Sequence, residues 1–121
     1  MRPRGKYPAR QHMLHLMKRR LKGSRRKINE HYNRSLYMSD LLWVKFQVGA
    51  YQYQLKHLKW YLEEGTKLLL PATRYRHWLT IKIILEALDK EADWTPQLQG
   101  SWTSPTGDKL KNNDQGESCR R

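Results

Sequence analysis

The strongest chemical signal in the 121-residue chain is a run of basic side chains between positions 18 and 27. Seven of these ten residues are basic: Lys18, Arg19, Arg20, Lys22, Arg25, Arg26 and Lys27. Each Lys or Arg that neutralises a phosphate releases condensed counterions, and the arginine fork also matches phosphate oxygens and guanine edges. The run therefore indicates binding to a polyanion, with RNA favoured over DNA. It is also typical of nuclear or nucleolar import signals, and a solvated basic face without a ligand stays open as a third interpretation.

Basic charge is concentrated at the N-terminus. Residues 1–29 carry eleven Lys or Arg and no acidic residue, whereas residues 30–93 carry nine basic and eight acidic residues. Residues 94–121 add four basic and three acidic residues, so the formal net charge of +13 divides into +11, +1 and +1. The chain is thus a basic arm joined to a nearly neutral body, which excludes an acidic chaperone. An acid-free, arginine-rich start also keeps mitochondrial import as an alternative location.

Aromatic side chains provide the second candidate site. Trp43, Phe46, Tyr53 and Trp60 recur at helical spacing. Aromatic rings can stack on unpaired bases, but at this spacing they are more often packed in a core or in a protein interface. The sequence therefore predicts a partner-docking face, or self-association of the chain, through residues 37–62.

Other candidate chemistry is weak. His12 and His15 stand at positions i and i+3, a spacing that can bind a metal, but no cysteine or carboxylate beside them completes a ligand set. The chain has neither a glycine-rich phosphate loop nor a nucleophile elbow, and the acidic pairs in 63–64 and 86–89 are expected on solvated surface. Cys119 is the single cysteine, so no internal disulfide can form. We therefore predict no catalytic residue, no metal site and no cofactor.

Helices must position these side chains. Pro3, Gly5 and Pro8 predict an extended segment over 1–11, followed by a short helix over 12–22 with a stripe of Leu14, Met17 and Leu21. Ser24 is a candidate N-cap for the next helix, and Ser39–Asp40 offers a further helix start.

The clearest periodicity lies in residues 37–62. One apolar series alternates spacings of four and three residues: Tyr37, Leu41, Val44, Val48, Tyr51, Leu55, Leu58 and Leu62. A second series lies on almost the opposite side of the predicted helix: Trp43, Phe46, Ala50, Tyr53, His57 and Trp60. This pattern favours one helix over 39–64, apolar on two faces and ending at Gly65. A β-hairpin over 44–55 stays open, because 44–48 and 51–55 each alternate strictly around Gly49–Ala50.

A last helix is predicted from a cap at Thr73 to about residue 92, with His77 and Ile81 on its apolar stripe. Arg74 and Arg76 lie in its first turns, where basic side chains oppose the helix dipole. We expect them either to point outward or to face an anion. Residues 94–121 are dominated by Pro, Gly, Ser, Thr, Asn and Gln, a composition that predicts a disordered polar tail.

Together these patterns predict a mainly α fold. It would comprise a basic arm (1–29) with a possible short helix, a helical hairpin or three-helix body (30–93) and a disordered tail (94–121). No apolar run approaches the roughly 20 residues of a membrane span.

Two functions are compatible with this organisation. The first is a non-enzymatic RNA-binding protein, a structural component of a ribonucleoprotein particle such as a ribosome. The second is a small regulatory or viral accessory adaptor that uses the basic segment for nuclear import and the two-faced helix to bind a partner protein. Deleting residues 1–29 would discriminate between the two, because only the first function requires the arm for binding.

Overall fold

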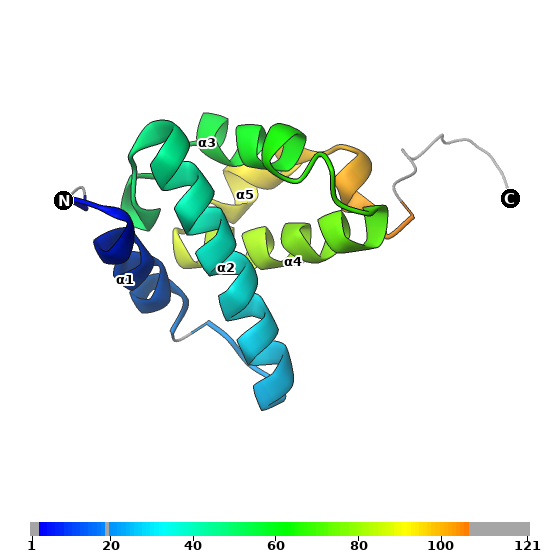
Figure 1. The fold of residues 1–121 in the computed structure, drawn as a ribbon. Helices are drawn as coiled ribbons and strands as arrows, with labels where there is room; N and C mark the ends of the chain where they lie inside the picture. The colour runs from blue at the N-terminus through cyan, green and yellow to red at the C-terminus, as the bar shows by residue number, and fades with distance from the viewer. Residues whose placement is uncertain (1–2, 19, 107–121) are drawn as a thin grey trace, which may run out of the picture.

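In the computed structural model, which describes residues 3–18 and 20–106, the chain is helical and these residues form no strand. The helices are, in chain order, α1 (Lys6–Met17), α2 (Arg25–Phe46), α3 (Leu55–Trp60), α4 (Pro71–Ala87) and α5 (Glu91–Trp94). Shorter turns complete the fold: 3₁₀ turns at Ala50–Gln52, Thr95–Leu98 and Ser101–Thr103, and a π-helical turn at Tyr61–Gly65. Figure 1 shows α2 running diagonally across α4, with α1 beside α2 at the left of the view. The predicted mainly α fold is confirmed.

Helix α1 begins inside the segment that was expected to be extended. Pro8 lies in its first turn, where the missing backbone N–H removes no hydrogen bond, so the proline does not prevent the helix. Ala9, Met13 and Met17 follow at intervals of four residues and are fully buried. The expected extended conformation is therefore wrong for residues 6–11. The predicted short helix forms, but it spans Lys6–Met17 rather than 12–22, and part of the basic arm packs in the core.

Helix α2 begins where the sequence predicts, because the Ser24 hydroxyl accepts a hydrogen bond from the Lys27 amide at 3.2 Å. The helix then runs without interruption through Ser39–Asp40, so the second predicted start is wrong. Ser39 is buried, as are Ser35, Met38 and Leu42 of the same helix. The Asp40 carboxylate accepts two hydrogen bonds from the Arg10 guanidinium, at 2.8 and 2.5 Å. This pair joins α1 to α2, and it lowers the pKa of Asp40 below its ordinary value.

The continuous helix expected over 39–64 is broken at Gln47. Gln47 adopts a left-handed conformation with φ 55°, and its amide donates to the carbonyl of Trp43 to close α2. At Gly49, an added Cβ would lie 2.7 Å from the ring of Pro3, so the close approach of the N-terminal segment requires glycine here. The chain changes direction at this point, and the π-helical turn packs against α2.

The break buries members of both apolar series within the molecule. Members of the two series that become buried are Val48, Leu58 and Leu62 from one, and Ala50, Tyr53 and His57 from the other. A single straight helix would leave one of these faces in water. Neither the continuous helix nor the β-hairpin over 44–55 forms. The chain instead folds back on itself, and this buries residues from both apolar faces.

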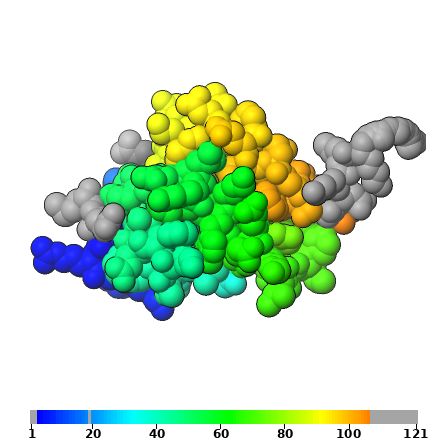
Figure 2. Space-filling view, turned by 90° about the horizontal axis from the view of Figure 1, so that it is seen from above, coloured from blue at the N-terminus to red at the C-terminus, as the bar shows by residue number. Residues whose placement is uncertain are grey.

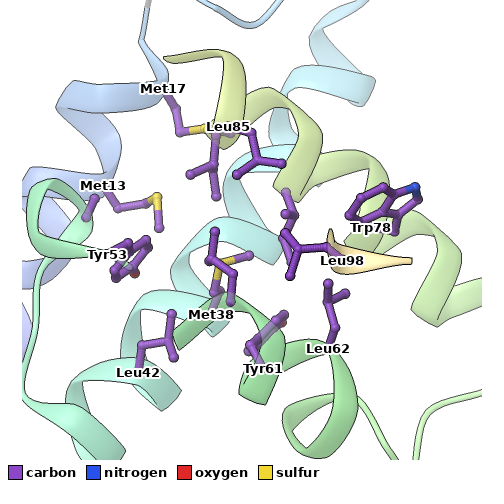
Figure 3. Close-up of a cluster of buried hydrophobic side chains, with 14 of the residues drawn as sticks. Met13, Met17, Met38, Leu42, Tyr53, Tyr61, Leu62, Trp78, Leu85 and Leu98 are labelled. Carbon is purple, nitrogen blue, oxygen red and sulfur yellow. The ribbon is translucent and has the colours of Figure 1, made fainter. Parts of the chain in front are cut away.

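The core draws side chains from almost every element (Figure 3). Its labelled members come from both ends of the chain as well as from the middle: Met13, Met17, Met38, Leu42, Tyr53, Tyr61, Leu62, Trp78, Leu85 and Leu98. The domain therefore depends on the N-terminal helix and on the residues after α4 as much as on the central helices.

Helix α4 ends in a Schellman motif at residue 87 rather than near 92. Asp89 has a positive φ of 60°, and the Lys90 amide donates to the Leu85 carbonyl at 2.9 Å. Residues 91–106 then pack against α4, and in Figure 2 their yellow-to-orange atoms lie beside the green atoms of the preceding helices. Leu98 is fully buried and Trp102 is 7% exposed. The expectation of disorder is thus wrong for 94–106, while 107–121, including Cys119, lie outside the described residues.

Candidate polyanion-binding surface

The predicted basic residues line the connection between α1 and α2 and the first turn of α2. All of them that the structure describes are exposed: Lys18, Arg20, Lys22, Arg25, Arg26 and Lys27. We call these six residues the basic segment; Arg19 lies outside the described residues. Figure 1 shows the first turns of α2 extending away from the other helices, which makes this surface accessible to a partner.

A concave region adjoins the basic segment. This hollow of about 640 Å³, here called the basic hollow, is lined by Ser24, Arg26, Lys27, Glu30, Arg34 and Arg76. Three of its four cations come from α2, and Arg76 comes from α4. One carboxylate, Glu30, is present and forms an exposed ion pair with Arg26 at 3.4 Å, a kind of pair that contributes little. The basic hollow therefore keeps a strong excess of positive charge.

Arg34 is held rigidly in the basic hollow. Its Nε donates to the Thr80 hydroxyl at 2.8 Å, and its Nη2 donates to Nδ1 of His31 at 3.2 Å. Nδ1 of His31 also lies 2.9 Å from the Thr80 hydroxyl. Burial lowers the pKa of Arg34; the charge of Glu30 opposes this effect, and the charge of Arg76 adds to it. Arg34 is thus a partly desolvated cation, close to a second cation and fixed in place.

The two arginines at the start of α4 have different roles. Arg74 turns inward, where Nη2 donates to the Leu62 carbonyl at 2.5 Å and Nε donates to the Thr66 hydroxyl at 3.1 Å. Its guanidinium also lies 5.5 Å from the ring centroid of Trp102. Arg74 therefore satisfies a carbonyl at the π-helical turn, and the expectation that it points outward or faces an anion is wrong. Arg76 is exposed and lines the basic hollow.

The aromatic residues expected to dock a partner do not gather on one exposed face. Tyr53 is 6% exposed and belongs to the core. Phe46 and Trp60 pack edge to face, with ring centroids 5.5 Å apart, and Trp43 is half-buried. Phe46 and Trp60, which lie on either side of the break at Gln47, are partly buried against the core. Self-association or partner binding through residues 37–62 stays a prediction.

A buried polar cluster adjoins Arg34. His77 is 5% exposed, and its Nδ1 shares a hydrogen bond with Oη of Tyr61 at 2.8 Å. The ring of Tyr37 packs edge-on against both side chains. Burial, reinforced by the charge of Arg34, lowers the pKa of His77 to about 4, and the same two causes lower the pKa of His31.

This cluster predicts a pH dependence of stability. In unfolded chains the pKa of His77 returns to 6.5, so between pH 6.5 and 4 the unfolded chain takes up a proton that the folded protein does not. The contribution of the buried, neutral His77 to stability is therefore fully present above pH 6.5 and is lost as the pH falls from 6.5 toward 4. We expect the free energy of unfolding, measured by urea denaturation, to be lower by on the order of 2 kcal/mol at pH 4.5 than at pH 7.

Two glutamine variants test the assignment of this loss to His77. His77→Gln removes the titrating group from the cluster and should abolish most of the fall between the two pH values. Asn33→Gln changes an exposed side chain that has no ionisable group and should leave the fall unchanged. If His77→Gln loses as much stability on acidification as the unmodified protein, His77 is not the cause.

Within residues 3–18 and 20–106, no group of three or more His, Cys, Asp or Glu side chains is placed to hold a metal ion. Among the helices of the same residues, none combines the length and apolar character that crossing a membrane requires.

Sequence reasoning identified the basic segment but missed Arg34 as part of the surface. A signal was present, because Lys27 and Arg34 are seven residues apart and therefore share one face of a helix that begins at Ser24. Arg76 was noted as a possible anion contact, but its place beside α2 depends on how the helices pack. Tertiary packing alone assembles the complete surface.

Comparison of the chain with models of known protein families, with curated proteins and with solved structures finds no significant match.

Proposed function

We propose that the protein is a non-enzymatic RNA-binding protein, and a structural component of a ribonucleoprotein particle, that contacts RNA phosphates through the basic segment and the basic hollow. The observation that carries this proposal is the basic hollow, in which four cations from two helices surround a single carboxylate. Phosphate oxygens complement such a group of guanidinium and ammonium donors.

The arrangement of Arg34 supports a binding role. Its guanidinium is already held by Thr80 and His31, so contact with an anion requires little further loss of side-chain freedom. The neighbouring charge of Arg76 is unfavourable in the free protein. A phosphate between them would relieve this repulsion.

RNA is favoured over DNA by the distribution of the cations. They come from the α1–α2 connection, the start of α2 and the start of α4. A reader of the DNA major groove instead presents base-contacting side chains along one exposed helix. Cations spread around hollows suit the irregular backbone of folded or single-stranded RNA better.

The alternative function, a regulatory or viral accessory adaptor, is not supported by the way residues 39–64 fold. It depended on one helix over 39–64 with two apolar faces, one of which would bind a partner. The chain breaks at Gln47 and packs members of both faces into its own core. We therefore propose the RNA-binding function alone.

A salt titration tests the proposal. We expect the logarithm of the association constant for a single-stranded RNA, measured by filter binding, to fall linearly with the logarithm of salt concentration. Each phosphate contact contributes about 0.7 to the slope, so five contacts give a slope of about −3.5 and about a 100-fold loss of affinity between 50 and 200 mM salt. A nearly flat dependence would contradict the phosphate contacts.

Matched charge variants locate the contacts. The double variant Arg26→Gln/Arg76→Gln removes two cations of the basic hollow and should reduce the slope by about 1.4. The double variant Lys67→Gln/Lys82→Gln changes the net charge equally at exposed positions outside both the basic segment and the basic hollow. It should leave the slope unchanged, and an equal reduction by both variants would indicate only a nonspecific effect of net charge.

A further inference from the structure

A second hollow lies at the other end of the basic segment. It measures about 660 Å³ and is formed by segments far apart in the sequence: His15 and Leu16 of α1, Lys18 and Arg20 of the basic segment, Tyr51 of the 3₁₀ turn and Ala87 of α4. We call it the aromatic hollow. It shares its two cations with the surface proposed above to contact RNA.

Tyr51 provides an accessible aromatic wall. Tyr51 is 45% exposed, in contrast to the core residues Tyr53, Tyr61, Trp78 and Trp102. Its hydroxyl shares a hydrogen bond of 2.5 Å with Nδ1 of His15, and its ring centroid lies 5.8 Å from that of His12 and 6.1 Å from that of His15. Helix α1 therefore holds the ring in position.

The same ring also borders a hollow of about 520 Å³ toward residues 46–57, with Lys56 among its lining residues. Tyr51 thus lines two open hollows, and each of them also has a lysine among its lining residues. An isolated exposed tyrosine would need no explanation. A fixed tyrosine between two hollows, at the end of a basic segment, presents a stacking surface beside phosphate-binding groups.

We propose that the aromatic hollow binds an unpaired nucleotide, with the base stacked on the Tyr51 ring and its phosphate contacted by Lys18 and Arg20. An aromatic platform beside cations is the combination that single-stranded nucleic acids require, since the ring takes the base and the cations take the backbone. Bases within a duplex are already stacked on one another and cannot reach the ring. This inference rests on the proposed RNA-binding function and specifies its substrate as single-stranded RNA.

Substitutions of Tyr51 test the inference on the full-length protein. An unstructured oligouridine and a fully paired RNA duplex are titrated at one salt concentration. Tyr51→Leu should weaken binding to oligouridine about tenfold and leave binding to the duplex unchanged. Tyr51→Phe keeps the ring and should retain most of the affinity for oligouridine. As a matched control, Tyr7→Leu changes a tyrosine that is 71% exposed outside the aromatic hollow, and it should alter neither affinity.

The outcomes separate this inference from the proposed function. If Tyr51→Leu binds oligouridine as tightly as the unmodified protein does, base stacking on Tyr51 is wrong while phosphate contact stands. Equal losses on both RNAs would also overturn it, because they would indicate a general effect on the surface. If neither RNA binds the unmodified protein, the proposed function itself fails and this inference fails with it.

A cross-linking measurement on the unmodified protein keeps the inference testable even if Tyr51→Leu does not fold. Ultraviolet irradiation of the complex with 4-thiouridine RNA should attach the RNA to a peptide that contains Tyr51. Cross-links confined to peptides that lack residues 50–52 would contradict the placement of the base.

Discussion

Replacing Trp102 by alanine is expected to lower the free energy of unfolding by about 3–5 kcal/mol, a large part of the stability of an ordinary small domain. The indole is 7% exposed, and its Nε1 donates to the Leu98 carbonyl at 2.6 Å. Its ring also lies 5.5 Å from the guanidinium of Arg74, whose Nη1 donates to the Ser101 hydroxyl at 3.4 Å. The substitution removes a large buried surface and leaves both partners without their contact.

Urea denaturation followed by circular dichroism measures this effect. Leu98→Ala, in the same segment and fully buried, should cost about 2–5 kcal/mol. Gln97→Ala alters an exposed neighbour and should change the free energy of unfolding by less than about 0.5 kcal/mol. If Trp102→Ala is as stable as Gln97→Ala, residues 94–106 do not contribute to the folded domain in solution.

The same segment shows why composition misleads. Residues 94–106 are rich in Pro, Gly, Ser, Thr and Gln, which is the composition of disordered chains. Two large apolar residues, Leu98 and Trp102, nevertheless stand four positions apart and both reach the core. Their spacing was the available signal, but composition averaged over 28 residues hid it.

Local patterns were reliable where a single element determines the outcome. The Ser24 cap was predicted and forms, and the stripe that includes His77 and Ile81 is buried on α4 as expected. Both features depend on residues within two helical turns of each other. A sequence can therefore specify them without knowledge of the rest of the fold.

The break at Gln47 could not be predicted from local sequence patterns. Its residue type does not favour a left-handed conformation, and the heptad pattern continues through it. The need for glycine at position 49 arises from Pro3, which is 46 residues away in sequence. The candidate surface also depends on residues far apart in the sequence, because tertiary packing alone brings Arg76 and Tyr51 close to the basic segment.

The second large effect is expected at α1. Met13 and Met17 are fully buried, and Met13→Ala or Met17→Ala should each lower the free energy of unfolding by about 2–5 kcal/mol. In contrast, Lys18→Gln/Arg20→Gln alters exposed side chains and should change stability by less than about 0.5 kcal/mol. The same urea denaturation measures all three variants.

These variants separate folding from binding, which deletion of residues 1–29 cannot do. That deletion removes α1 with its two core methionines and the Arg10–Asp40 pair, so a loss of RNA binding would follow from unfolding alone. Lys18→Gln/Arg20→Gln should instead keep the stability of the unmodified protein and reduce the salt slope for single-stranded RNA by about 1.4. Full stability of Met17→Ala would show that α1 does not pack on the core in solution. The N-terminal charge would then belong to a separate arm, as the sequence alone indicates.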